Sequence, residues 1–489
     1  MFINRLPRFE PLTSEDLATL DRGWERVARE VGVQFDDPEA LRLFSEAGQT
    51  VDGDSVRFDP GFLRAQAALA PATFALQARN PARSLIIGGD HMIFCAAQGP
   101  PFVRSGNERR DGTYADLERF LMLTQVTDTL DTPGRNIVEP NDLPLDVRHL
   151  LRALASIRLT DRVWAGEPSS TVAAEDCIRM AEIVFGGRQA IEQNPVIFAN
   201  CNVNSPLRFD GSMLKGILAY AAAGQAVIIT PFLLMGAMAP VTVAAALVQQ
   251  TVEVLAGIAL VQLVRPGTPC VMGSFLSSTD MKTGSPAFGG PESAYGLYAS
   301  GQMARHLNLP WRSGGGTLTA SPAVDFQAGY EAFNTLISAF LAGANVCWQS
   351  AGWLEGGLVT CFEKFVADVE LLDLLHHQFT TVEISEATMA FGAHEEVGHG
   401  GHFFGAAHTL ERFRDCFWRA PLGTTDNFAR WTKAGQPDHA ERATRRVEEL
   451  IELYEAPPLD SDIEAALLEF VTRRADELGD PVDVAPLLR

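Results

Sequence analysis

Tryptophan, acidic and glycine residues gather in one stretch of the sequence, residues 313–370. Trp348 and Trp353 stand there close to Glu355 and to several glycines. Aromatic faces attract a quaternary ammonium group through cation–π interaction, and a nearby negative charge adds to that attraction. We therefore expect this stretch to bind a quaternary amine, although core packing is the alternative for each aromatic residue taken singly. Further aromatic residues on expected loops are Phe275, Phe288, Tyr295, Phe362, Phe403 and Phe404.

Three other chemistries receive less support from the sequence. His394, His399, His402 and His408 lie within fifteen residues, and clustered imidazoles can bind zinc. Their spacing matches no structural zinc pattern and no cysteine lies beside them, so we predict no metal. Gly398, Gly400 and Gly401 would give this segment the freedom of a loop that closes over the site, which is the role implied by the family resemblance described below. The glycines at 314–316 lack the spacing and the lysine of a nucleotide-binding loop, and no GxSxG motif is present.

A repeated pattern of strand, loop and helix surrounds these residues. Eight short apolar segments alternate with helical patterns, which is typical of a (β/α)8 TIM barrel, with a doubly wound sheet as the alternative. The expected strands are residues 101–104, 136–139, 163–166, 196–200, 226–230, 270–273, 311–314 and 345–349. We predict a helical and β-hairpin cap over residues 1–95, the barrel over 96–380, and a C-terminal lid loop with two surface helices over 381–489.

Active sites of such barrels form at the carboxyl ends of the strands. Polar residues directly follow several of the expected strands. Three asparagines, Asn200, Asn202 and Asn204, stand at the end of the fourth, and Ser274 follows the sixth. These four residues are the candidates for contacts with a cofactor.

The overall composition excludes some partners. The chain has 489 residues and a formal net charge of −22, with a pI near 4.9. Nucleic acid and an anionic membrane would both repel such a surface. The seven cysteines are dispersed, which favours reduced thiols in the cytoplasm, and the N-terminus lacks the apolar core of a secretion signal. The longest apolar stretch, residues 241–264, contains Gln249, Gln250 and Glu253 and is expected to be a buried helix.

Several segments also carry a resemblance to a known family. They include VAREVGVQFDDPEALRLFSEAG, RRDGTYADLERFLML, MGAMAPVTVAAALVQQTVEVLAGIALVQLVRPGTPCVMG, GHGGHFFGAAHTLERFR and the stretch 313–370. Over nearly the whole chain, these segments resemble the trimethylamine methyltransferase family. Founding members of that family carry pyrrolysine in the active site, and this sequence has none. The resemblance therefore implies a non-pyrrolysine member, similar to glycine betaine-type methyltransferases.

The resemblance implies methyl transfer from a quaternary amine such as glycine betaine to the Co(I) of a separate corrinoid protein. Tetrahydrofolate as direct acceptor, a barrel that binds the amine without catalysis, and a metal-dependent lyase or hydrolase remain alternatives. A homo-oligomer is also expected. A substrate carboxylate would be held by His402, Asn202, Asn204, Gln327 or Arg312, among which the sequence does not choose. The candidate catalytic residues are Glu355 and His402, and the candidate substrate-binding residues are Trp348, Gln349, Trp353, Phe403, Gln327, Asp325 and Glu331.

Overall fold

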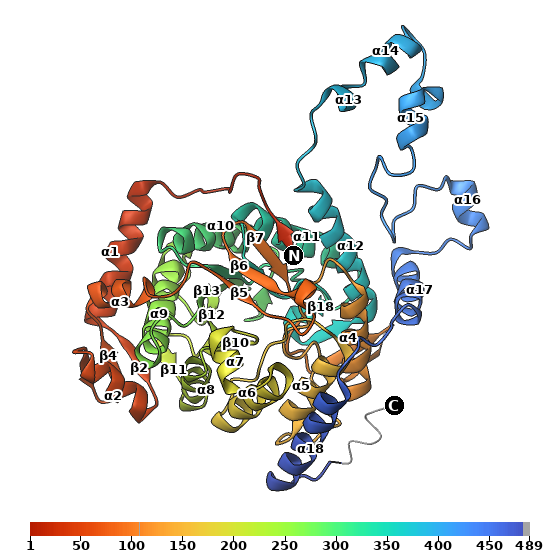
Figure 1. Cartoon of the computed structure of the whole chain (residues 1–489). Coiled ribbons are helices and arrows are strands. Elements are labelled where there is room, and N and C mark those ends of the chain that lie inside the picture. Colours follow the sequence, from red (N-terminus) through yellow and green to blue (C-terminus); the bar gives the residue numbers. More distant parts are fainter. Residues whose placement is uncertain (107, 483–489) are drawn as a thin grey trace.

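A computed structural model describes residues 1–106 and 108–482 of the chain and has a mixed α/β fold (Figure 1). The predicted α/β class is confirmed. At its centre lies a ladder of parallel strands, covered on the outside by helices. In spatial order the ladder consists of β10 (Phe198–Val203), β12 (Ala226–Met235), β13 (Cys270–Gly273), β16 (Trp311–Ser313), β17 (Val346–Cys347) and β7 (His91–Phe94).

Two short bridged segments connect the ends of this ladder. Cys95, directly after β7, forms a parallel bridge with Thr132, and Ala165 forms one with Phe198 of β10. The Ala165 N–H donates to the carbonyl of Gly134 at 2.9 Å, which joins the two segments to each other. A continuous set of backbone contacts therefore runs from β7 through these segments to β10.

The first expected strand is present but lies outside the ladder, and the second is absent. Residues 101–104 fall in β8 (Phe102–Ser105), which pairs with β9 (Glu108–Asp111) and β19 (Val359–Cys361) in a separate small sheet. The ladder uses β7 instead. Residues 136–139 form no strand, because the pairing backbone lies earlier, around residue 132. Strands near the six other expected positions are present as strands or as the bridge at Ala165.

Helices follow the successive strands and pack on the outside of the ladder (Figure 1). Side-chain caps start many of them: Thr113 accepts from the backbone N–H of Asp116, and Asp325 from that of Ala328. They are α4 (Tyr114–Val126), α5 (Arg148–Leu159), α6 (Thr171–Phe185), α7 (Arg188–Gln193), α8 (Gly211–Ala222), α9 (Val243–Val264), α10 (Pro291–His306), α11 (Phe326–Ala342) and α12 (Phe362–Gln378).

Helix α9 is apolar on all sides because other elements surround it. It packs between strand β12 and the N-terminal helices α1 (Ser14–Glu30) and α3 (Pro60–Ala67). Within the described residues it is the one helix whose length and composition would allow it to cross a membrane, but 78% of its most apolar window is buried in the protein. The expectation of a buried helix is confirmed.

The N-terminal residues form a layer of small helices, a small sheet and a hairpin. Strands β11 (Arg208–Phe209), β2 (Val33–Phe35), β4 (Ser55–Arg57) and β3 (Thr50–Asp52) make the small sheet, beside α2 (Pro38–Glu46). Strands β5 (Thr73–Leu76) and β6 (Leu85–Gly88) form the hairpin, and β6 passes by a tight turn to β7. Short strand β1 (Phe2–Ile3) pairs with β7, and the 3-10 turn η1 (Pro81–Arg83) precedes β6.

Two further small strand pairs lie beyond the carboxyl ends of the ladder strands. Strand β14 (Phe275–Thr279) pairs with the second half of β12 and with β15 (Pro286–Ala287). Strand β18 (Trp353–Leu354) pairs with β19, and the turn η2 (Glu355–Gly357) connects them. These pairs bring aromatic residues over the end of the ladder.

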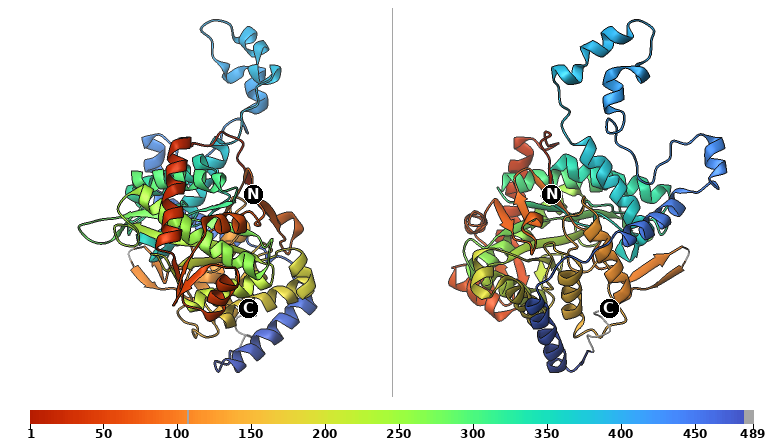
Figure 2. Two further views of the ribbon diagram at one scale, coloured as in Figure 1. Left: turned by 90° about the vertical axis from the view of Figure 1, so that its left-hand side faces the viewer. Right: turned by 45° about the vertical axis from the view of Figure 1, so that its right-hand side comes forward.

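After α12 the chain leaves the body and returns (Figures 1 and 2). The excursion contains α13 (Glu386–Met389), α14 (Phe391–Val397), η3 (Phe403–Gly405), α15 (Ala407–Arg412) and α16 (Phe428–Lys433). The two surface helices expected after it are confirmed as α17 (His439–Glu452), which packs on α12 and α4, and α18 (Ser461–Glu477), which packs on α5 and α6.

Candidate active site

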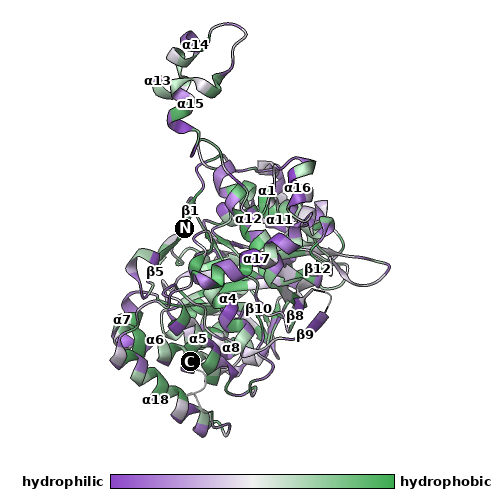
Figure 3. Cartoon of the chain, turned by 90° about the vertical axis from the view of Figure 1, so that its right-hand side faces the viewer, coloured by the Kyte–Doolittle hydropathy of each residue, from purple (hydrophilic) through white to green (hydrophobic). Residues whose placement is uncertain are grey.

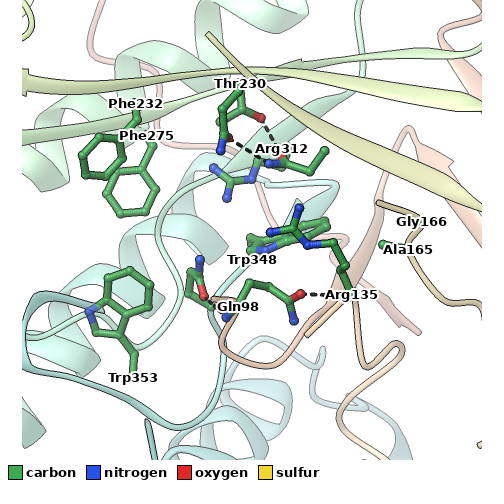
Figure 4. A pocket seen from close by; sticks show the side chains of 13 residues that line it. Gln98, Arg135, Ala165, Gly166, Thr230, Phe232, Phe275, Arg312, Trp348 and Trp353 are labelled. Carbon is green, nitrogen blue, oxygen red and sulfur yellow. Dashed lines mark hydrogen bonds between the residues drawn. The ribbon is translucent and has the colours of Figure 1, made fainter. Parts of the chain in front are cut away.

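A cavity of about 200 Å³ lies at the carboxyl ends of the ladder strands (Figure 4). This is where α/β proteins of this type bind their ligands. Residues from most of the strands reach it, so it depends on the complete ladder. Its lining consists of Gln98, Arg135, Ala165, Gly166, Asn200, Asn202, Thr230, Phe232, Phe275, Arg312, Trp348, Gln349 and Trp353.

One side of the cavity is aromatic. Phe232 and Phe275 are cross-strand partners on β12 and β14, with ring centroids 4.6 Å apart. Trp353 lies 6.2 Å from Phe275, and Phe288 packs edge-on behind both rings. Gly357 is required beneath Trp353, because a Cβ there would come within 2.4 Å of the indole. The result is a cluster of fixed aromatic faces that suits a cationic group.

Arg312 is the electrostatic centre of the cavity. Its side chain, on β16, is buried, and one amino group donates to the carbonyl of Ser274 at 2.9 Å. Its Nε has no hydrogen-bond partner, and no carboxylate of the described residues forms an ion pair with the guanidinium. The guanidinium carbon lies 5.4 Å from the centroid of Trp348 and 5.8 Å from that of Phe275. Burial lowers the pKa of Arg312 to about 10.

A buried cation without a counterion is costly, and proteins normally pair such a group or use it to bind a ligand. Arg312 therefore marks the place where an anionic ligand group would be most strongly held. A carboxylate is well suited, because it can accept two parallel hydrogen bonds from one guanidinium.

Arg135 lines the same cavity but is already neutralised. It contacts Glu167 at 2.8 Å, and Glu167 also contacts Arg152. Burial opposes ionisation of Glu167, but the two arginines outweigh it and hold the pKa of this carboxyl below its usual value. Arg135 and Arg312 thus differ in function: the first belongs to an internal ion network, and the second remains available to a ligand.

Amide side chains cover the remaining wall. Asn200 and Asn202 of β10 are linked by a 3.1 Å hydrogen bond, and the Thr230 hydroxyl donates to Asn200 at 2.8 Å. The Gln98 backbone N–H donates to the side-chain oxygen of Gln349 at 2.6 Å. Gln349 adopts a φ of 65°, which is uncommon for a residue other than glycine. These bonds fix the orientation of the amides toward the cavity.

Five of the predicted substrate-binding and cofactor-binding residues line the cavity together: Trp348, Gln349, Trp353, Asn200 and Asn202. Arg312, a candidate for holding the carboxylate, and Phe275, one of the aromatic candidates, line it as well. The other predicted residues lie outside its lining. Glu355 follows Trp353 but pairs with Arg109 at 2.7 Å. Asn204 accepts from the backbone of Asp210, and Ser274 lies behind Arg312.

Three predicted residues support the loop between β16 and α11. Asp325 caps α11. Glu331 is buried and accepts from the Thr319 hydroxyl at 2.6 Å and from the Ala320 N–H at 2.9 Å. Gln327 donates to Glu331 at 3.0 Å. Each of these three polar side chains therefore forms hydrogen bonds within the chain.

His402 and Phe403 lie on the excursion after α12, which stands clear of the body. The histidines around them are spread along this segment. Within the described part of the chain, no three His, Cys, Asp or Glu side chains come together in a way that could hold a metal ion.

Sequence reasoning missed several cavity residues, among them Gln98 and Arg135. Both follow strand segments that were assigned to the wrong residues, so the rule that strand ends carry the site pointed elsewhere. Gln98 follows β7, and Arg135 follows the segment bridged at Thr132. For Gln98 a signal was available, because the apolar run that ends at Cys95 marks the end of β7.

Comparison with known proteins identifies the family. The family model described as Trimethylamine methyltransferase (MTTB) matches residues 1–479. Glycine betaine methyltransferase of Desulfitobacterium hafniense (strain Y51) is 37% identical over 476 residues, covering 97% of this chain and 99% of that protein. Proline betaine:corrinoid methyltransferase of Eubacterium limosum is 28% identical over 483 residues, covering 94% and 96%. Trimethylamine methyltransferase MttB of Desulfitobacterium hafniense (strain DSM 10664 / DCB-2) is 28% identical over 477 residues, covering 96% and 94%. The chain thus belongs to the trimethylamine methyltransferase family and is a methyltransferase.

Proposed function

We propose that this enzyme removes a methyl group from a small betaine, with glycine betaine as the first candidate, and passes it to a corrinoid carried by a separate protein. The observation that carries the proposal is the combination of an unpaired, buried Arg312 with an aromatic cluster in one cavity. A betaine has both matching groups, a carboxylate and a quaternary ammonium. Trimethylamine has no carboxylate and would leave Arg312 without a counterion.

The cavity residues orient the substrate. Arg312 holds the carboxylate, and the faces of Trp353, Phe275 and Phe232 surround the methyl groups of the ammonium. Asn200 and Asn202 limit how far the ligand can rotate. Fixing one methyl group in line with an attacking nucleophile, in a site from which water is excluded, is the main contribution a protein can make to this reaction.

The transfer itself needs no proton. The C–N bond breaks with both electrons remaining on nitrogen, so the product is a neutral tertiary amine and a general acid is not required. A reduced corrinoid would supply the electron pair that receives the methyl group. This agrees with a cavity lining that contains aromatic, amide and guanidinium groups and no carboxylate or imidazole.

The surroundings of the cavity suit a docking protein. Large apolar side chains are exposed on loops that lie beyond the carboxyl ends of the strands, at Leu145 (76% exposed), Val241 (68%), Met281 (73%) and Leu358 (49%). Exposed apolar groups of this kind mark contact surfaces. The proline betaine relative is named as a corrinoid methyltransferase, and we extend that acceptor to this chain.

Three further expectations belong to the same proposal. The bridges at Thr132 and Ala165 support closure of the ladder into a (β/α)8 barrel. Six buried thiols without disulfides support a cytoplasmic location. Glu355 lies two residues after Trp353 and is paired with Arg109. It would influence the reaction by positioning the loop that carries Trp353.

The function can be tested by calorimetric titration with glycine betaine, proline betaine, carnitine and trimethylamine. Each titration is followed by a methyl-transfer assay with Co(I) cobalamin and with tetrahydrofolate. We expect a betaine to bind more tightly than trimethylamine and to methylate cobalamin. Transfer to tetrahydrofolate alone would correct the acceptor, and binding without any transfer would indicate a non-catalytic role.

Trp353→Ala should weaken betaine binding about tenfold. A cation–π contact in a desolvated site contributes roughly 1–2 kcal/mol, which corresponds to a factor of about 5–30 in affinity. Trp353→Phe keeps an aromatic face and serves as the matched control, with a smaller loss. Calorimetry on both variants checks this expectation, and equal affinities for the alanine variant and the wild type would remove Trp353 from the site.

Val241→Asp combined with Met281→Asp should slow methyl transfer to a corrinoid protein while leaving the affinity for glycine betaine unchanged. The charges would replace apolar contacts on the proposed docking surface, whereas both residues lie outside the cavity lining. Free cobalamin needs no protein contact, so its methylation should be retained. An equal loss with free cobalamin and with the corrinoid protein would contradict this docking surface.

A further inference from the structure

We infer that residues 380–417, here called the arm, dock on a second copy of this chain. The arm begins at the end of α12 and stands clear of the body in every view (Figures 1, 2 and 3). It carries α13, α14, η3 and α15, none longer than seven residues. Helices this short are not stable in water without tertiary contacts.

The arm has almost no interior of its own. Ala393 and Ala406 are its buried residues, and its internal contacts include the ring pair of His394 and Phe403 and a 3.1 Å bond from Ala407 N to Glu396. Ordering a segment of this length costs conformational entropy that such contacts cannot offset. A surface outside the arm must therefore supply the missing contacts.

The arm exposes the apolar side chains for those contacts. Leu410 lies on α15, and Phe413 and Phe417 lie on the turn that follows it. The large apolar residues are Val382, Ile384, Met389, Phe391, Phe403, Phe404, Leu410, Phe413 and Phe417, with exposed fractions from 43% to 85%. Together they offer on the order of 1,000 Å², against roughly 800 Å² contributed by each partner to a standard protein interface.

The partner that fits such a surface is another copy of the same chain. A permanently exposed apolar surface of this size promotes aggregation unless it is always covered. A methyl acceptor has to leave after each transfer, and interfaces that open and close are less apolar than obligate ones. A second copy is present in equal amount whenever the chain is made, and a two-fold arrangement would cover both arms at once.

The arm does not cover the cavity of its own chain. The first half of α12 lies beside the cavity, where Asp368 accepts from the N–H of Gly352 at 2.8 Å. The arm leaves from the other end of that helix. The return of the chain is fixed to the body by Trp418, whose indole N–H donates to Asp373 at 2.6 Å.

A candidate receiving surface lies on the body, beside the first half of α12. A groove of about 430 Å³ lies between α11, α12 and the start of α17. Phe326 on its wall is 85% exposed and contacts Tyr330, which is 50% exposed. The exposed aromatic wall of the groove matches the apolar side chains of the arm, so we assign this groove as the site that receives the arm.

Sedimentation of the full-length protein tests the inference. We expect the wild type to be a dimer or a multiple of one, and both Phe404→Asp with Phe417→Asp and Phe326→Asp alone to give monomers with unchanged circular dichroism. Val241→Asp with Met281→Asp is the matched control, because it adds the same charges elsewhere, and should keep the oligomer. A monomeric wild type, or arm variants that stay oligomeric, would overturn the inference.

Crosslinking tests the groove separately and does not depend on the stability of the variants. Cys416 at the end of the arm is exposed, whereas the other six cysteines are buried. Gly329 lines the groove, and a Cβ there would meet nothing within 4 Å. A short bis-maleimide should therefore link Gly329→Cys protein into covalent dimers, and Cys416→Ser should abolish them. Absence of these dimers in an oligomeric protein would reject the groove as the receiving site. Neither readout requires ligand, so failure of the betaine proposal would not affect them.

Discussion

Replacing Arg312 by methionine is expected to weaken glycine betaine binding roughly 100-fold, which corresponds to about 3 kcal/mol. Methionine fills a similar volume but cannot donate hydrogen bonds to a carboxylate. A charge-assisted, bidentate contact in a buried site is worth this much because water cannot replace it. Tetramethylammonium, which has no carboxylate, should bind the variant at least as tightly as the wild type, because the variant no longer repels a cation. Calorimetry with both ligands measures the difference.

The stability of the same variant provides a second readout. Arg312 is buried without a carboxylate partner, and burial lowers its pKa to about 10. Its charge therefore destabilises the unliganded protein at neutral pH, and removing it should not lower the melting temperature. A residue with a purely structural role would show the opposite result.

Arg135→Met is the matched control for this prediction. It removes an arginine from the same cavity, but this arginine neutralises the buried Glu167. The melting temperature should fall, and the loss of betaine affinity should be smaller than that of Arg312→Met. If Arg312→Met instead bound glycine betaine as well as the wild type, the proposed substrate class would lose its main support.

Much of the fold could be predicted because local signals and tertiary structure agree. Helix α4, for example, begins where its sequence indicates, since Thr113 caps it and its apolar face is buried. The first strand of the ladder was predicted at the wrong residues, and the reason is physical. β7 pairs with hairpin strand β6 on one side and with β17 on the other, and an apolar run does not reveal which partners it has.

The site was predicted in part. Trp348, Gln349 and Trp353 were found because aromatic and amide residues stood together after a strand. The sequence could not rank Arg312 above the other possible carboxylate donors, since its lack of a counterion is a three-dimensional property. The segment around His402 was expected to close over the cavity, but its direction depends on the end of α12 from which it leaves, and local sequence does not encode this.

Lys364→Met should cause the largest loss of stability, about 3–5 kcal/mol, because it leaves a buried charge without its partner. Lys364 and Asp368 lie one turn apart on α12, are both buried and form an ion pair. Burial raises the pKa of Asp368, and Lys364 opposes that shift. Calorimetric melting of the variant and the wild type measures the loss, which is a large part of the 5–15 kcal/mol typical of a folded domain.

The same pair also anchors the cavity wall, so its loss should reach the ligand. Asp368 accepts from the Thr317 hydroxyl at 2.7 Å and from the Gly352 N–H at 2.8 Å, which joins α12 to the loops before α11 and before Trp353. Adding Asp368→Asn to Lys364→Met removes the unpaired charge but keeps an oxygen acceptor for these bonds. We therefore expect the double variant to be more stable than Lys364→Met and to recover most of its betaine affinity. A double variant less stable than the single one would mean that the carboxylate, and not its pairing with Lys364, holds the loops in place.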